Sequence, residues 1–285
     1  MPLQTRTLGS TGVEVTILGL GGEGILRTYD YEDDADELIN AALDLGVRYF
    51  ESARAYAGSE GYYGNALGER RSQVFLTSKS HGRDRRTAMA HLKTTLRNMR
   101  TDHLDLWQLH DMRNREEIEE VFSPDGAIEA FIEAKERGLT RFVGVTGHHD
   151  PSILKECLER FDFDTVLIPV NPAEPRRDSF LQEVLPVAVS RNMGIIGMKV
   201  YARGLVTRLP RFQSMEPFFR FALSQPVSTV VIGCDNLSQL EENLSFAERF
   251  SPMTREESDR LVEEVGLHAD ELMYYKERRV VGEPE

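Results

Sequence analysis

Four side chains capable of acid–base chemistry stand at or just after short apolar runs in the first half of the chain. Glu51 and Tyr56 lie five residues apart, and Lys79 and His110 each follow a β-prone run. A Lys–Glu pair beside a phenol offers a way to favour the phenolate and so lower the phenol's pKa from ~10. A phenol tuned in this way can act as a general acid near neutral pH, while His110 orients a carbonyl or relays the proton. These residues indicate proton transfer to a carbonyl if the fold brings them together.

The alternation of β-prone runs with helix-like segments predicts the elements that position these residues. Two short extended runs around a Gly-Ser-Thr-Gly turn predict an N-terminal hairpin. Eight further strands are expected, each followed by a helical segment, at residues 17–22, 47–50, 74–78, 104–109, 142–145, 165–170, 195–200 and 228–232. Eight βα units favour an α/β fold of the (β/α)8 TIM barrel type, typically ~250 residues long, with the hairpin closing its bottom.

The C-terminal region predicts one element beyond the barrel. An extra helix is expected from Thr254 to about Tyr274, because Thr254 and Glu257 have capping-box spacing. No linker or break in composition interrupts the chain. Residues 1–285 are therefore expected to form a single domain, in which 251–285 are a C-terminal helix and tail. The alternative is a doubly wound open sheet, whose glycine fingerprint the segment 19–24 fits only loosely.

In a barrel, functional residues come from the carboxyl ends of the strands. In the strand 104–109, alternate residues share a face, so His110 is expected to point into the barrel mouth and Trp107 toward the helices. The complete set of expected strand ends is Glu51, Lys79, His110, Thr146, Asn171, Met198–Lys199 and Gly233.

Composition narrows the class of partner. The 285 residues are 40% apolar and 28% charged, with a net charge of −13, which disfavours nucleic acid and anionic membranes. Two distant cysteines and no signal-peptide pattern favour a reducing compartment, and no apolar run approaches the ~18–20 residues of a membrane span. A cytoplasmic location is expected, and the oligomeric state stays open.

Several ordered motifs resemble the aldo-keto reductases, from about Leu3 to Phe250. The family's Phe-Asp-Thr-Ala-x-x-Tyr motif is similar to residues 50–56, and its lysine and histidine strands are similar to 75–79 and 101–110. Its C-terminal I-P-G and Q-x-E-E-N-L signatures are similar to residues 231–233 and 239–244.

The resemblance implies reduction of an aldehyde or ketone, with hydride from a nicotinamide cofactor. Tyr56 would be the acid, Lys79 and Glu51 would tune it, and His110 would position the carbonyl. The cofactor contacts that it implies are Gly22, Thr146, Asn171, Met198, Lys199, Gly233, Gln239, Glu242 and Asn243. Family habit favours NADP(H), and NAD(H) stays possible because Asp235 would repel a 2′-phosphate. Glu51 stands where the family usually has an aspartate.

Two other functions are compatible with the sequence. A cofactor-binding, redox-responsive subunit with little turnover would retain the pocket without the chemistry. A metal-dependent barrel hydrolase is the remoter alternative, suggested by His110-Asp111 and by His148-His149-Asp150. Its site would need several such ligands converging on one ion, and a neighbouring lysine would compete with that ion, so no metal is expected.

Overall fold

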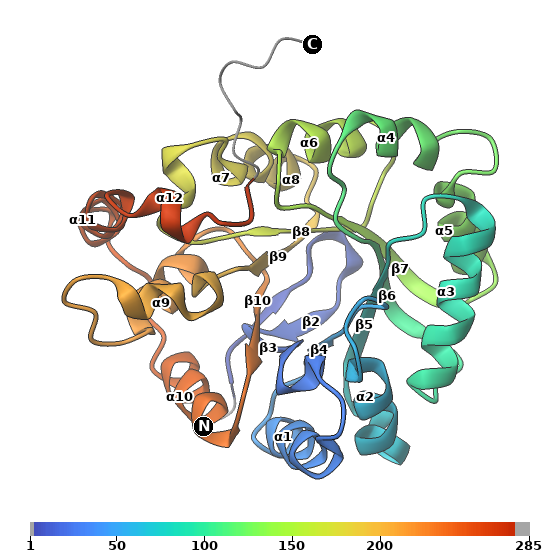
Figure 1. The fold of residues 1–285 in the computed structure, drawn as a ribbon, viewed down its shortest axis with the longest axis horizontal. Coiled ribbons are helices and arrows are strands. Elements are labelled where there is room, and N and C mark those ends of the chain that lie inside the picture. The colour runs from blue at the N-terminus through green and yellow to red at the C-terminus, as the bar shows by residue number, and fades with distance from the viewer. Residues whose placement is uncertain (1–2, 277–285) are drawn as a thin grey trace.

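A closed parallel barrel forms the centre of the computed structural model, which describes residues 3–276 (Figure 1). Its strands are β3 (Leu18–Gly24), β4 (Tyr49–Glu51), β5 (Phe75–Ser80), β6 (Leu104–Leu109), β7 (Thr140–Thr146), β8 (Thr165–Pro169), β9 (Gly194–Met198) and β10 (Thr229–Cys234). The strands follow one another around the barrel in chain order, and β10 pairs with β3 to close it. The predicted (β/α)8 fold is confirmed, and the open sheet is excluded.

Helices form an outer ring around the strands (Figure 1). They are α1 (Glu32–Asp44), α2 (Ser59–Leu67), α3 (Arg85–Asn98), α4 (Arg115–Val121), α5 (Ala127–Glu136), α6 (Pro151–Arg160), α7 (Phe180–Glu183), α8 (Leu185–Ser190), α9 (Glu216–Ser224), α10 (Leu237–Glu248), α11 (Arg255–Gly266) and α12 (Ala269–Leu272). Trp107 of β6 faces this ring and stacks on Phe131 of α5, with ring centroids 3.9 Å apart, as the alternation in β6 predicted. The sequence pattern missed α4, although Asn114 caps it through the Glu117 N–H.

The N-terminal hairpin closes the bottom of the barrel, as predicted. Its strands β1 (Thr5–Thr7) and β2 (Glu14–Thr16) pair antiparallel around a 3₁₀ turn (Gly9–Thr11). The Ser10 N–H donates to the Asn192 carbonyl, 2.7 Å away, just before β9 begins. The hairpin also contributes two side chains to an apolar cluster inside the barrel, which contains Leu8, Val15, Tyr49, Phe75, Leu106, Leu167, Ile196 and Val231. The amino ends of the strands are thus filled, and chemistry is left to the carboxyl ends.

The predicted C-terminal helix is present but broken. Thr254 and Glu257 form the expected capping box at the start of α11. The helix ends at Gly266, however, and a separate short α12 follows, so one helix through Tyr274 is wrong. The break exposes Leu267 and redirects the chain so that Leu272 and Tyr275 become buried. The part of the predicted tail beyond residue 276 lies outside the described residues.

The structure also bears on the helical segment after β8, on the two cysteines and on membrane-spanning helices. The helical segment that follows β8 is divided at Val184 into α7 and α8, because Pro186 lies in the first turn of α8 and cannot donate a backbone hydrogen bond. Both cysteines are free and buried. Among residues 3–276, no helix is long and apolar enough to cross a membrane.

Candidate active site

Glu51 and Lys79 form a buried ion pair across two neighbouring strands. Glu51 ends β4 and Lys79 lies near the end of β5, and Lys79 Nζ is 2.7 Å from Glu51 Oε1. The same ammonium donates to the Ser52 carbonyl at 3.0 Å. Burial raises the pKa of Glu51, and Lys79 opposes that rise. The pair therefore holds the ammonium in one position at the barrel mouth.

Tyr56 and His110 meet above this pair. Their ring centroids are 5.8 Å apart with the planes at 83°, and Lys79 Nζ lies 4.8 Å from the centroid of the Tyr56 ring. His110 is fixed through its backbone, since its N–H donates to the Ser80 carbonyl and its carbonyl accepts from Arg83. The fold thus brings together all four residues of the predicted catalytic set, from the carboxyl ends of β4, β5 and β6.

The protonation of Tyr56 differs from the expectation. Burial, and then the carboxylates of Glu51 and Glu23, raise the pKa of Tyr56 well above its usual value of 10, whereas the sequence argument predicted a lower one. Burial, followed by the charge of Lys79, lowers the pKa of His110 well below its usual range. At neutral pH the phenol therefore keeps its proton and the imidazole is uncharged.

A cleft of about 520 Å³ lies beside these residues. Arg27 lines it, and the guanidinium carbon of Arg27 is also 4.8 Å from the centroid of the Tyr56 ring, which joins the cleft to the acid–base group. Five of the nine expected cofactor residues line the cleft: Lys199, Gly233, Gln239, Glu242 and Asn243. They come from the ends of β9 and β10 and from α10.

Four of the expected cofactor residues lie outside this lining and have other contacts. A Cβ on Gly22 would lie 2.4 Å from Ser59 Oγ and 2.7 Å from the Glu51 carbonyl oxygen. A glycine is therefore needed where β3 passes the end of β4 and the loop that follows it. The Thr146 hydroxyl accepts from the Asp111 N–H at 2.8 Å. Met198 packs against the apolar cluster inside the barrel.

Asn171, the fourth, holds three segments together. Its Nδ2 donates to the Lys199 carbonyl at 3.2 Å and to the Tyr275 hydroxyl at 2.9 Å. Its Oδ1 accepts from the Ala173 N–H at 3.0 Å. The buried amide therefore ties the end of β8 to the end of β9 and to the C-terminal segment.

The cleft also contains a charged group that the sequence argument did not place there. Glu23 Oε1 lies 2.7 Å from Arg27 Nη1 and 3.0 Å from Arg203 Nη2. Burial alone would raise the pKa of Glu23, but Lys199, Arg203 and Arg27 lower it to about 2. The strand-end rule could have found Glu23, because β3 runs to Gly24 rather than stopping at Gly22.

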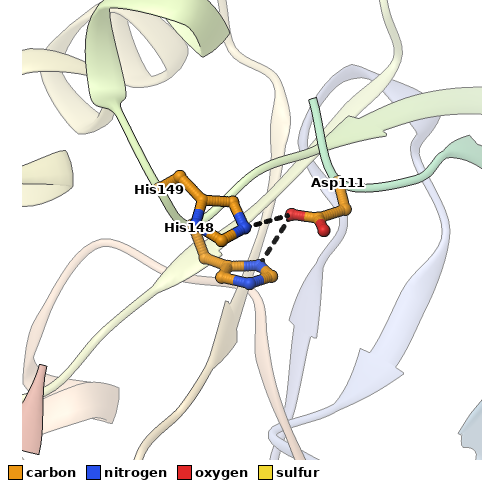
Figure 2. Close-up of side chains that lie close together, drawn as sticks. All are labelled: Asp111, His148 and His149. Atoms are coloured by element: carbon orange, nitrogen blue, oxygen red, sulfur yellow. Dashed lines mark ion pairs between the residues drawn. The ribbon is translucent and has the colours of Figure 1, made fainter. Parts of the chain in front are cut away.

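A second polar cluster lies at the ends of β6 and β7 (Figure 2). Asp111 Oδ1 is 3.1 Å from His148 Nδ1 and 3.3 Å from His149 Nε2. Arg113 holds the other carboxylate oxygen through Nε at 2.8 Å and Nη2 at 2.7 Å. Three of the residues behind the metal alternative thus converge with a spacing compatible with an ion, beside an arginine that already neutralises the carboxylate.

Comparison with known proteins identifies the family. A sequence profile of the Aldo/keto reductase family matches residues 17–217, more than half of the chain. The uncharacterized oxidoreductase YqkF of Bacillus subtilis is 23% identical and aligns with 86% of this chain and 91% of its own. The L-galactose dehydrogenase of Arabidopsis thaliana is 25% identical, over 85% of this chain and 88% of its own.

Solved structures share the fold. The aldo-keto reductase AKR11C1 of Bacillus halodurans superimposes with a TM-score of 0.77 at 24% identity, covering 98% of this chain and 99% of its own. An aldo-keto reductase of Klebsiella pneumoniae, in complex with NADPH, gives a TM-score of 0.73 at 17% identity over the whole of both chains. With the profile match over most of the barrel, the chain belongs to the aldo/keto reductase family of oxidoreductases.

Proposed function

We propose that the protein reduces an aldehyde or ketone to an alcohol with a nicotinamide dinucleotide, and that Tyr56 supplies the proton. The observation that carries this proposal is the convergence of Tyr56, Lys79, Glu51 and His110 beside a cleft lined by the ends of β9 and β10. Catalytic groups of barrel enzymes lie at this end of the strands. A small carbonyl compound is the corresponding substrate.

The residues that line the cleft support a dinucleotide as its ligand. Gly233 lines the cleft where β10 packs closely on β3, because a Cβ there would lie 2.7 Å from the Glu23 carbonyl carbon. The 12-residue helix α10 begins beside the cleft, and its first N–H groups suit a phosphate. Gln239, Glu242 and Asn243 would hold the adenosine end, and the bound cofactor would supply the hydride.

The chain's own residues would handle the proton. Tyr56 is protonated at neutral pH and would donate to the carbonyl oxygen as negative charge develops there. The uncharged His110 would donate a hydrogen bond to the same oxygen. The Lys79 ammonium, kept in place by Glu51 and the Ser52 carbonyl, would stabilise the tyrosinate that remains.

The choice between NADPH and NADH follows from charges at the adenosine end. Three carboxylates line the cleft, those of Glu23, Asp235 and Glu242, and they match its three cations, Arg27, Lys199 and Arg203. A 2′-phosphate would find little uncompensated positive charge, so any preference for NADPH should be less than about tenfold, or ~1.4 kcal/mol. Titration of protein fluorescence with each cofactor measures both dissociation constants.

Tyr56→Phe tests the proposed acid. The variant should lose at least about 100-fold in kcat for a broad panel of aldehydes and ketones, aldoses included, since general acid catalysis contributes roughly 10²–10⁴-fold. Cofactor affinity should stay within about twofold of wild type. Unchanged turnover in Tyr56→Phe would refute the acid assignment, and tight cofactor binding without turnover in the wild type would favour a cofactor-binding subunit.

A further inference from the structure

Three side chains of metal-ligating types converge where the loops after β6 and β7 meet, as Figure 2 shows. Asp111 lies two residues beyond β6, and His148 and His149 lie two and three residues beyond β7. One carboxylate oxygen and one nitrogen of each ring all lie within 4.8 Å of one another. Asp111 Oδ1 is 3.1 Å from His148 Nδ1 and 3.3 Å from His149 Nε2, so both rings face a single oxygen.

Hydrogen bonding does not account for this close approach. Asp111 Oδ1 and both nitrogens of His149 are buried, and none of these three atoms has a hydrogen-bond partner among residues 3–276. Burying polar atoms without partners costs free energy, and native proteins keep few of them. An ion held between the three side chains would satisfy Asp111 Oδ1 and His149 Nε2 at once.

The distances between the facing atoms match those around a coordinated ion. Ligand atoms about 2.0–2.1 Å from a tetrahedral zinc ion lie roughly 3.3–3.4 Å from one another. The O–N distances of 3.1 and 3.3 Å come within about 0.3 Å of that separation. Two imidazoles and one carboxylate form a donor set that suits zinc and similar transition ions, whereas calcium and magnesium prefer oxygen alone.

Arg113 fixes the carboxylate without covering the oxygen that faces the rings. Its Nε and Nη2 lie 2.8 and 2.7 Å from Asp111 Oδ2. Outer contacts of this kind orient a ligating carboxylate. The Arg113 side chain is 51% exposed, so solvent and salt screen its repulsion of an ion at Oδ1.

The nearby lysines also have carboxylate neighbours that offset their charge. Lys79 is paired with Glu51 at 2.7 Å rather than directed at this cluster. Burial lowers the pKa of Lys199, and Glu23 opposes that fall more than any other group does. A cation beside His148 therefore does not face an uncompensated ammonium.

We propose that Asp111, His148 and His149 form a binding site for a divalent ion of the zinc class. The ligand atoms would be Asp111 Oδ1, His148 Nδ1 and His149 Nε2, and each imidazole would carry its proton on the other nitrogen. Three protein ligands leave at least one coordination position for a water molecule. The ion would join the loop after β6 to the loop after β7. The site is independent of the proposed carbonyl reduction, because it shares none of the four acid–base residues.

Zinc titration of wild type, after treatment with a chelator, tests the site by isothermal titration calorimetry. One Zn²⁺ per chain should bind with a Kd of about 10 µM or tighter. His148→Gln and His149→Gln should each weaken binding by more than the roughly 10–100-fold that losing an outer contact costs. His103→Gln is the matched control, because it makes the same change in a histidine–aspartate pair at the surface, and it should bind zinc as wild type does.

Cobalt reports the geometry of the site directly. Co²⁺ added to metal-free wild type should give the intense visible absorption of a tetrahedral ion, and this band should be absent in His148→Gln and His149→Gln. Zinc should also raise the Tm of wild type, but not of these two variants. Failure of wild type to bind zinc would refute the site even if a variant failed to fold. Equal zinc affinity in wild type and both variants would refute it as well.

Discussion

At the scale of single residues, the extra methylene of Glu51 is accommodated without losing the ion pair. Its Oε1 reaches Lys79 Nζ at 2.7 Å, while Oε2 has no hydrogen-bond partner among the described residues. The carboxylate and the ammonium are both almost completely buried, so each depends on the other for charge compensation. Lys79 is thereby kept beneath the Tyr56 ring, where a compensating charge is useful if the phenol gives up its proton.

The pH profile of carbonyl reduction should be flat across the neutral range. The pKa of Tyr56 is raised above 10, so the phenol stays protonated below that value, and the pKa of His110 is lowered below 6.5, so the imidazole stays neutral above that value. Neither group changes its charge between about pH 6.5 and 10. Steady-state kcat/KM measured across that range with a saturating cofactor checks this, and a change with a midpoint near pH 8 would contradict it.

Strand-end reasoning located Glu51, Lys79 and His110 because it needs only the order of strands and the adjacency of their carboxyl ends. Tyr56 lies in the loop after β4, five residues beyond Glu51. This reasoning could not give the direction of the Tyr56 pKa shift, which depends on burial and on Glu23, a residue brought in from another strand. It also could not foresee that the Asn171 amide is occupied by Lys199 and Tyr275. Such contacts depend on segments far apart in sequence, for which a spacing pattern carries no information.

At the scale of elements, the hairpin turn is held by close backbone packing. Gly9 has φ of 52°, and a Cβ on it would lie 2.2 Å from the Met193 carbonyl carbon. Gly12, in the same turn, has φ of 70° but nothing within 4 Å of its Cβ position. An alanine at Gly12 would therefore meet only the strain of a left-handed backbone, whereas an alanine at Gly9 would also clash with Met193.

Gly12→Ala should cost about 1–2 kcal/mol of the free energy of unfolding, the price of left-handed backbone alone. Gly9→Ala should cost clearly more, because the turn must also move away from β9. Urea denaturation of both variants beside wild type gives the two values. Equal losses would mean that the hairpin does not dock on Met193 as described.

Elements with a strong periodic pattern were predictable, and those set by tertiary contacts were not. The β-prone runs predicted all eight barrel strands, and the Thr254–Glu257 spacing predicted the start of α11. The end of α11 was missed because apolar residues, among them Ala269, Leu272 and Met273, continue in helical spacing past Gly266. That glycine packs against Arg176, a contact that no local pattern reveals.

At the scale of the whole molecule, a buried cluster of polar contacts, here called the clasp, fastens the C-terminal segment to the loop after β8. Lys276 Nζ lies 3.0 Å from Glu174 Oε2, and the Tyr275 hydroxyl donates to Glu174 Oε1 at 2.7 Å. The ammonium also donates to the carbonyls of Arg177 and Asp178. Since Tyr275 in turn accepts from Asn171, the clasp connects the C-terminal segment to the ends of β8 and β9.

Removing the cation of this clasp should be strongly destabilising. Lys276→Met leaves the fully buried carboxylate of Glu174 without its partner, and breaking such a pair costs about 3–5 kcal/mol. Urea denaturation measures the loss. Arg255→Met, which removes a solvent-exposed i,i+4 pair with Asp259, is the control and should leave the midpoint unchanged. A small effect of Lys276→Met would mean that the segment is not fastened in solution.

The clasp also sets an order of events during synthesis on the ribosome. The barrel cannot close until β10 has emerged to pair with β3, and the C-terminal segment cannot be fastened until Lys276 has followed. Until β10 is made, the nascent protein presents unpaired strand edges, a kind of surface that chaperones bind. A barrel whose first and last strands must pair therefore stays incomplete until β10 has been made.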